Sequence, residues 1–164
     1  MANKKTKEKK KTNHILKLII CFLIVFLVAF LGSIFTSSGV NTTWYDSIRP
    51  EITPPNWVFP IVWNFLFILI AFSLFFAWIQ AKDKNQKKKI IFLYSINFIL
   101  NILWSFLFFG LRNPLLGFIE IILVWISILI LIFGLWRISK KASLFLIPYL
   151  LWVGFASIIN YLAI

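Results

Sequence analysis

The sequence predicts an all-α membrane protein, a bundle of five transmembrane helices, and three observations support this prediction. The 164-residue chain is 61% hydrophobic and only 13% charged, whereas an average soluble domain is about half apolar and about a quarter charged. Its mean hydropathy is +0.92. Five apolar stretches are each long enough to cross a bilayer, which takes roughly 20 residues. They are Ile15–Phe35, Trp57–Ile79, Ile90–Leu111, Leu115–Trp136 and Ala142–Ile164.

The stretches are continuous rather than alternating, and they are about twice as long as the ten-residue strands of a membrane β-barrel, so strands are excluded. We expect two parts: a basic, unstructured cytoplasmic tail at residues 1–14 and one five-helix domain at residues 15–164. The first stretch also resembles a signal peptide, but it is longer than the usual apolar core of about 7–15 residues. Cleavage there is the less favoured alternative and would leave four spans.

The net charge of +12 is distributed unevenly along the chain. Fifteen cations fall before or at the start of the first span, between the second and third, and between the fourth and fifth, all on one side of a five-span protein. The other side has only Arg49 and Arg112. Basic short loops stay in the cytoplasm, which predicts a cytoplasmic N-terminus and an outer C-terminus. The composition is typical of an AT-rich bacterial genome and favours the plasma membrane. Orientation and attraction to anionic lipid account for these cations, so nucleic-acid binding is not expected.

An aromatic turn stiffened by proline, Trp44–Trp57, separates the first two spans. It follows Thr36–Thr43, which we expect to be a flexible exit from the first span. Each proline fixes its own φ angle and restrains the residue before it. Farther along, Asn113-Pro114 predicts a tight hinge, and Pro148 predicts a tolerated kink early in the fifth span.

Several polar residues lie at membrane depth, where they are costly and face the bundle interior. Asn97, Asn101 and Ser105 recur every four residues and therefore share one helical face. Amides on separate helices act either as interhelical hydrogen bonds or, with inward tryptophans, as part of a shared polar and aromatic pocket; we favour the pocket. Glu120 has two interpretations, a purely structural acid or a group that binds a ligand or a proton.

Tryptophan is the most informative residue type, with eight copies. Trp78 and Trp136 lie near the cytoplasmic ends of their spans, where interfacial belts are ordinary. Four others are candidates for stacking on a flat conjugated ligand: Trp44, Trp57, Trp63 and Trp152.

Three separated motifs resemble those of one family, TspO/MBR, which includes the tryptophan-rich sensory proteins and the translocator proteins. The first is the turn, with Trp44, Tyr45, Ile48, Arg49, Pro50, Pro54, Pro55, Trp57, Phe59 and Trp63 in the family's positions. The second is Leu100–Gly110 in the third span, and the third is Pro148–Asn160 in the fifth. Together they extend over residues 44–160.

The resemblance implies a five-helix bundle, usually a homodimer, with a ligand cavity below the first loop, which acts as a lid. It implies a porphyrin such as protoporphyrin IX as ligand, with no required cofactor. By matching positions, the cavity residues are Trp44, Tyr45, Trp63, Asn101 and Trp152, and the lid residues are Arg49, Pro50, Pro54, Pro55 and Trp57. The cholesterol-recognition pattern of the animal relatives is absent, because no lysine or arginine follows Tyr161.

Three functions remain open. The favoured one is a tetrapyrrole-binding sensory or regulatory protein, with Arg49 pairing with a propionate. A light-dependent porphyrin degradation would use Trp63 and Trp152 as electron-rich indoles, since no conventional catalytic site is present. The alternative is a transporter of porphyrins or lipids. We expect no metal site, because His14 and Cys21 lie outside the motifs.

Overall fold

The computed structural model describes the backbone of residues 2–164 and the side chains of residues 12–164. In this part of the chain every regular element is helical. The elements are α1 (Ala2–Gly39), α2 (Thr43–Ile48), α3 (Val58–Gln80), α4 (Lys84–Ser105), the π-helical turn η1 (Phe106–Gly110), α5 (Pro114–Trp136), α6 (Lys140–Phe145) and α7 (Ile147–Leu162).

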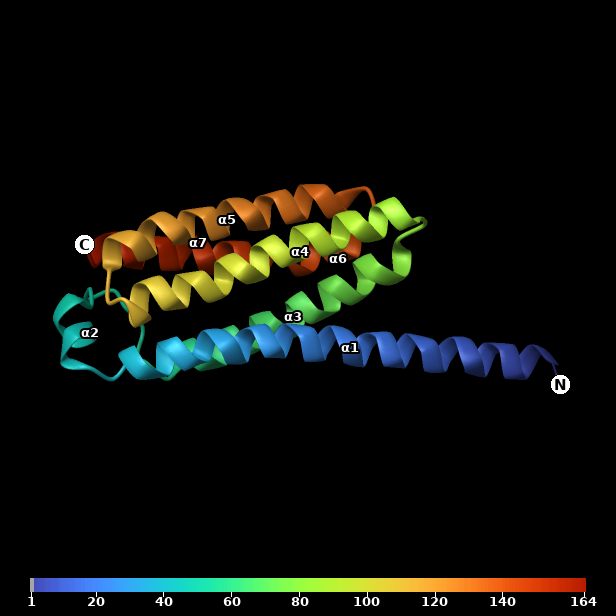
Figure 1. Cartoon of the computed structure of the whole chain (residues 1–164), viewed down its shortest axis with the longest axis horizontal. Coiled ribbons are helices and arrows are strands. Elements are labelled where there is room, and N and C mark those ends of the chain that lie inside the picture. Colours follow the sequence, from blue (N-terminus) through green and yellow to red (C-terminus); the bar gives the residue numbers. More distant parts are fainter. Residues whose placement is uncertain (1) are drawn as a thin grey trace.

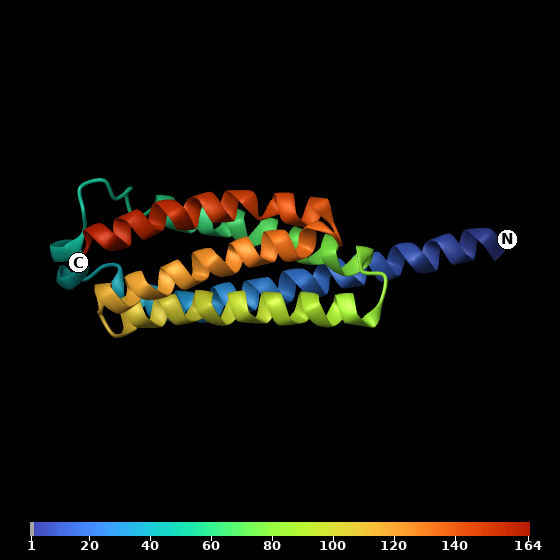
Figure 2. The same cartoon turned by 90° about the horizontal axis from the view of Figure 1, so that it is seen from above.

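Five helical segments run side by side along one axis, and each is long and apolar enough to cross a membrane (Figures 1 and 2). They are α1, α3, α4 with η1, α5, and α6 with α7. The two termini lie at opposite ends of the bundle, as an odd number of spans requires (Figure 1). The predicted fold class is confirmed, and the chain is a multi-pass membrane protein. We call the end with α2 the lid end and the end with α6 the basic end.

α1 is longer than predicted at both ends. It begins at Ala2, so the prediction of an unstructured tail at residues 1–14 is wrong for the described backbone; Met1 and the side chains of residues 2–11 lie outside the described parts. It continues to Gly39, so the first half of the exit at Thr36–Thr43 is also helical. The hydroxyls of Ser33, Ser37 and Ser38 donate to carbonyls three residues earlier, at 2.7, 3.2 and 2.8 Å. These bonds satisfy polar side chains on the helix itself, so this stretch stays helical inside a membrane.

The proline signals mark real boundaries. The fifth span breaks at Leu146, between α6 and α7, and Pro148 occupies the first turn of α7. There a missing N–H costs little, because it has no helical partner. Between the third and fourth spans, Arg112 has a positive φ of 51°. Asn113 then caps α5 by accepting from the Leu116 amide at 3.0 Å, and Pro114 opens that helix.

The basic half of the bundle is closely packed. Ser73 of α3 donates to the Ala142 carbonyl of α6 at 2.6 Å. The Tyr94 hydroxyl of α4 lies 2.6 Å from the same Ser73 oxygen, and all three residues are almost fully buried. One hydrogen-bonded contact therefore joins three helices, and it satisfies a backbone carbonyl next to the break in the fifth span.

Candidate functional site

A cavity of about 730 Å³ occupies the lid half of the bundle. Its wall comes from α1, α3, α4, η1 and α7, and α2 with the following loop covers it. α5 contributes nothing to the wall among the described residues. The volume lies within the range of small-molecule sites, about 300–1,000 Å³. The closely packed basic half and the hollow lid half of the molecule are thus separate along the bundle axis.

The cavity wall has rings and the neutral amides of Asn101 and Asn160 in its depth, and it has its charge at the lid. Trp63, Phe67 and Trp104 present rings to it from α3 and α4. Arg49 and Asn56 reach it from the loop, and Arg49 is the one charged residue on the described wall. A ligand with a flat apolar body and one polar edge matches this division.

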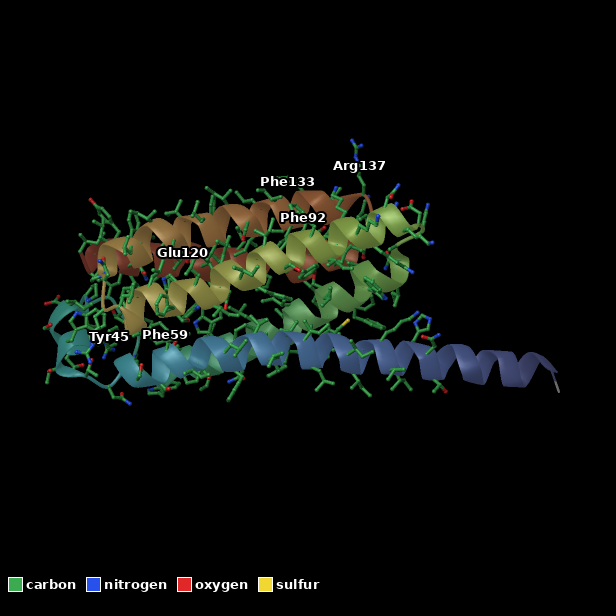
Figure 3. The ribbon with its side chains drawn as sticks, in the orientation of Figure 1. Tyr45, Phe59, Phe92, Glu120, Phe133 and Arg137 are labelled. Carbon is green, nitrogen blue, oxygen red and sulfur yellow. The ribbon has the colours of Figure 1, made fainter. Side chains whose placement is uncertain are left out.

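The lid is held down by edge-on and tilted ring contacts. Thr42 caps α2 by accepting from the Tyr45 amide at 3.3 Å. The short helix then packs Trp44 against Phe108, with ring centroids 5.8 Å apart. Tyr45 packs against Phe109 at 5.6 Å and is buried. Figure 3 shows Tyr45 on α2, at the lid end of the bundle. Such ring pairs contribute on the order of 1 kcal/mol each beyond their buried area.

Arg49 closes the loop that follows α2. Its guanidinium Nη2 donates to the carbonyls of Thr53 and Pro54 at 3.3 and 2.7 Å. Burial raises the pKa of the Tyr45 hydroxyl above its ordinary value; the Arg49 cation opposes that shift, and the Asp46 carboxylate adds to it. The Tyr45 hydroxyl is therefore neutral at neutral pH, and the charge facing the cavity is that of Arg49.

The π-helical turn η1 explains how two adjacent rings both face inward. In an α-helix, neighbouring residues point about 100° apart, yet Phe108 and Phe109 are both buried. The wider turn ends with the Leu111 amide donating to the Phe106 carbonyl at 2.8 Å. π-turns are rare and often occur at functional sites. Helical periodicity did not predict this turn; two adjacent phenylalanines at a span end, before a glycine, were the available signal.

Two glycines make room for these rings. A Cβ on Gly39 would lie 2.7 Å from the Phe109 ring, and a Cβ on Gly117 would lie 2.6 Å from the Phe108 ring. No real side chain tolerates such distances without a shift of its neighbour. The rings that support the lid are therefore positioned by close approach to α1 and α5.

The predicted site residues divide into two groups. Six of them line the cavity or its mouth, and these are Tyr45, Arg49, Pro50, Trp57, Trp63 and Asn101. Trp44, Pro54, Pro55 and Trp152 are outside the lining set. Trp152 packs edge-on against Phe59, a lining residue near the lid in Figure 3, with ring centroids 5.9 Å apart. Whether any of them binds a ligand stays a prediction.

The amides at membrane depth join the helices around the cavity floor. Asn97 donates to the Ser127 hydroxyl at 2.8 Å, and Asn101 donates to the Tyr149 hydroxyl at 3.0 Å. The Trp104 indole donates to the Asn160 side-chain oxygen at 3.0 Å. Asn97, Asn101 and Ser105 are all buried, which confirms that they share an inward face. These amides are interhelical links, and Asn101 and Asn160 also line the cavity.

Some buried polar atoms have no partner in the described structure. Asn56 Oδ1 is one, and its residue lines the cavity. The others are Thr53 Oγ1, both Glu120 oxygens and the Trp152 indole nitrogen. A ligand donor or an ordered water in the cavity would satisfy Asn56. Glu120 lies apart from the lid, on the α5 side of the bundle (Figure 3), and is outside the lining set. Both interpretations of Glu120 stay predictions.

Groups that commonly bind metals are dispersed. Among residues whose side chains are described, no three His, Cys, Asp or Glu side chains gather closely enough to hold a metal ion. Cys21 is buried, and His14 packs edge-on against Phe75 with centroids 6.4 Å apart. The cavity is instead suited to binding through rings, amides and one guanidinium.

Comparison with known proteins agrees with this architecture. The model of the TspO/MBR family matches residues 21–163. The tryptophan-rich protein TspO of Archaeoglobus fulgidus is 42% identical over 149 residues, which cover 90% of this chain and 95% of that protein. Its counterpart in Chlorobaculum tepidum is 39% identical, over 90% and 94% of the two chains. The human translocator protein is 28% identical, over 82% and 80%.

Proposed function

Because the chain belongs to the TspO/MBR family, we propose that it binds a tetrapyrrole such as protoporphyrin IX in the cavity below the lid, as a membrane sensory or regulatory protein. The observation that supports this is the division of the wall, with rings in its depth and Arg49 and Asn56 at its mouth. Protoporphyrin IX has the same division, since its two propionates lie on one edge of a flat apolar macrocycle.

In this arrangement the macrocycle lies against the Trp63 and Trp104 rings. Its propionate edge points to the lid, where Arg49 has nitrogens beyond the Nη2 that holds the loop. Asn56 Oδ1 accepts a hydrogen bond from a protonated propionic acid or a bridging water. The described wall has no histidine, cysteine or methionine, and its one tyrosine, Tyr45, packs against Phe109, so the proposal rests on the macrocycle and its propionates and does not depend on iron.

The test is a titration of the purified full chain with protoporphyrin IX in the dark, followed by tryptophan emission. We expect saturable quenching. The dimethyl ester, which lacks the anionic edge, should bind about tenfold more weakly, the usual effect of one charge-assisted hydrogen bond. Arg49→Gln should remove that preference, so that the acid and the ester bind the variant with equal affinity. No saturable quenching, or equal binding of acid and ester by the unmodified protein, would contradict the proposal.

A second candidate is light-dependent porphyrin loss, which the ring of Trp63 on the cavity wall favours. An excited porphyrin transfers energy to dioxygen, and the resulting singlet oxygen adds to the porphyrin or to a nearby indole. We expect Trp63→Phe to change the rate of band loss under light and Trp152→Phe to change it less, because Trp152 is outside the lining set. A rate that both variants leave unchanged would remove the indoles from the reaction.

We also propose the orientation, the membrane and the assembly. The basic end faces the cytoplasm of a plasma membrane and the lid faces outward, which the positive-inside rule supports. The protein is a homodimer. Reporter fusions at each terminus test the orientation, and light scattering with detergent correction tests the dimer.

A further inference from the structure

A second hollow lies on the membrane-facing seam between α1 and α3, in the basic half. It is a groove of about 350 Å³, and every residue that lines it is apolar: Leu18, Ile19, Phe22, Leu23 and Phe26 of α1, and Phe72 of α3. Leu23 is 65% exposed, so the groove is open to the bilayer rather than closed by protein. We define these six residues as the seam groove.

The seam groove continues into the ligand cavity. Phe26 lines both spaces. On the same side of α1, Ala29, Phe30 and Ser33 continue the wall into the cavity. These positions follow a spacing of three or four residues, which keeps them on one helical face. An elongated apolar group in the groove therefore has its far end at the floor of the cavity.

The other end of the seam groove leads to positive charge through a run of rings. Phe72 packs on Phe145 at 5.9 Å, and Phe145 stacks on Phe76 at 5.6 Å with planes 5° apart. The Lys141 ammonium lies over the Phe76 ring, 5.9 Å from its centroid. His14 packs against the adjoining Phe75.

The surrounding charge is strongly one-sided. Described side chains at the basic end include nine cations: Lys17, Lys82, Lys84, Lys87, Lys88, Lys89, Arg137, Lys140 and Lys141. The one described acid in these segments is Asp83, and it already caps α4 by accepting from the Gln86 amide at 2.8 Å. An anionic group at this end meets attraction with almost no opposing charge.

The dimensions match one lipid tail. His14 and Phe26 are twelve residues apart, which is about 18 Å along a helix. Half of a bilayer's hydrocarbon core is about 15 Å thick. An acyl chain whose head group lies level with His14 and Lys141 therefore ends close to Phe26.

We propose that the seam groove is a binding site for an anionic phospholipid of the leaflet at the basic end. Its phosphate lies by Lys141, one acyl chain fills the groove, and the end of that chain reaches the cavity floor beside Phe26. The site shares only Phe26 with the lining of the ligand cavity, and its ligand differs from that of the tetrapyrrole proposal. It gives the membrane's lipid composition a direct contact with the cavity.

Photo-crosslinking of the full chain tests the site. The protein is reconstituted in phosphatidylcholine vesicles that contain a small fraction of phosphatidylglycerol with a diazirine at the end of one acyl chain. Peptide mass spectrometry then locates the adducts. We expect them to concentrate on residues 22–30 of α1 and 67–72 of α3, and to be at least severalfold fewer when the same label is on phosphatidylcholine. Adducts spread evenly over the lipid-facing helices, or equal labelling by both lipids, would overturn the proposal.

Two pairs of variants sharpen the result. Leu23→Trp fills the groove and should abolish the concentrated adducts, whereas Leu27→Trp, at a residue that is also exposed but outside the groove, should not. Lys141→Gln should reduce the preference for phosphatidylglycerol about fivefold, and Lys88→Gln should not. Equal effects within either pair would contradict the site. The adduct map of the unmodified protein decides the question even if Leu23→Trp fails to fold, and no porphyrin is used, so failure of the tetrapyrrole proposal would be seen separately.

Discussion

The two halves of the bundle contain similar aromatic and polar residues, but the basic half is closely packed and the lid half encloses a cavity. In the basic half, Tyr94 and Ala142 are almost fully buried, and their hydrogen bonds close on one another through Ser73. In the lid half, rings of the same kind stand around a hollow of about 730 Å³, and Asn56 Oδ1 is left without a partner. Packing density is what stabilises a helical bundle within lipid, since lipid tails are as apolar as the side chains. The comparison indicates that the basic half maintains the fold, whereas the lid half leaves unpacked the space in which we propose that the ligand binds.

The largest effect on stability should come from the packed half. Tyr94→Ala leaves a void among three helices and removes the bond to Ser73. At about 24 cal/mol per Å³ of cavity, we expect a loss of roughly 2–3 kcal/mol. Unfolding in mixed micelles with increasing dodecyl sulfate measures it. Ile91→Ala, at an exposed neighbour, is the control. Porphyrin affinity should change by less than about twofold; a large change would mean that the halves are coupled.

Gly117→Ala should reduce both the stability of the protein and its affinity for porphyrin, and the loss of stability should be smaller than that of Tyr94→Ala. The new methyl group would lie 2.6 Å from the Phe108 ring and 2.9 Å from its Cβ, so Phe108 must move toward the cavity and the lid. Overpacking of this kind costs about 1–3 kcal/mol. We expect weaker porphyrin binding together with reduced stability.

Gly154→Ala is the matched control for this change, because its Cβ would meet the Trp125 indole nitrogen at a milder 3.3 Å. Equal losses of binding in the two variants would show that Phe108 does not shape the cavity.

Trp63→Leu should weaken protoporphyrin IX binding with little change in stability. Loss of one stacked ring corresponds to about 1 kcal/mol, or roughly fivefold to tenfold in Kd. Trp136→Leu, at an exposed position next to Lys140, is the control. Trp152→Leu separates two predictions: the family resemblance places Trp152 in the cavity, whereas its position behind Phe59 predicts a smaller effect than Trp63→Leu. Fluorescence titration in the dark measures all three.

The same comparison shows what the sequence was able to predict. Apolar run length predicted five spans, because it depends on composition over about 20 residues, whereas loop charge predicted only the orientation, which stays a prediction. The inward face of Asn97 and Asn101 followed from helical periodicity. The π-turn at Phe106–Gly110 did not, because it breaks that periodicity. The helical path of α1 to Gly39 was also missed, because serine reads as a loop residue unless its back-bonding in a membrane is considered.

The motif residues identified the family, but a residue's place in the motif did not reliably predict whether its side chain lines the cavity. Trp44 and Tyr45 are adjacent in the motif, but only Tyr45 lines the cavity, while Trp44 supports the Phe108 ring. Asn56, whose free oxygen is at the cavity mouth, carried no signal of its own between a proline and a tryptophan. Which face of a short loop helix is turned inward depends on contacts with another span, and a single sequence does not contain those distances.

The smallest predicted effect tests the electrostatics of the lid itself. Burial and the Asp46 carboxylate raise the pKa of Tyr45, and the Arg49 cation opposes them. Asp46→Asn should therefore lower the pKa of Tyr45, and Arg49→Gln should raise it further. Tyrosinate absorbance, taken as the difference from Tyr45→Phe, measures both shifts and isolates this residue from the other three tyrosines.

The upward direction of the Tyr45 pKa shift also determines how the stability of the lid depends on pH. A tyrosine whose folded pKa lies above its unfolded value of about 10 contributes stability that is fully present below that pH. This contribution is lost as pH rises through the folded pKa. The ring contacts that hold the lid should thus weaken only in strong base, and Tyr45→Phe should abolish that part of the transition while leaving unfolding of the packed half unchanged. Shifts of the same sign in Asp46→Asn and Arg49→Gln would instead mean that opening of the lid, not local charge, controls the exposure of Tyr45.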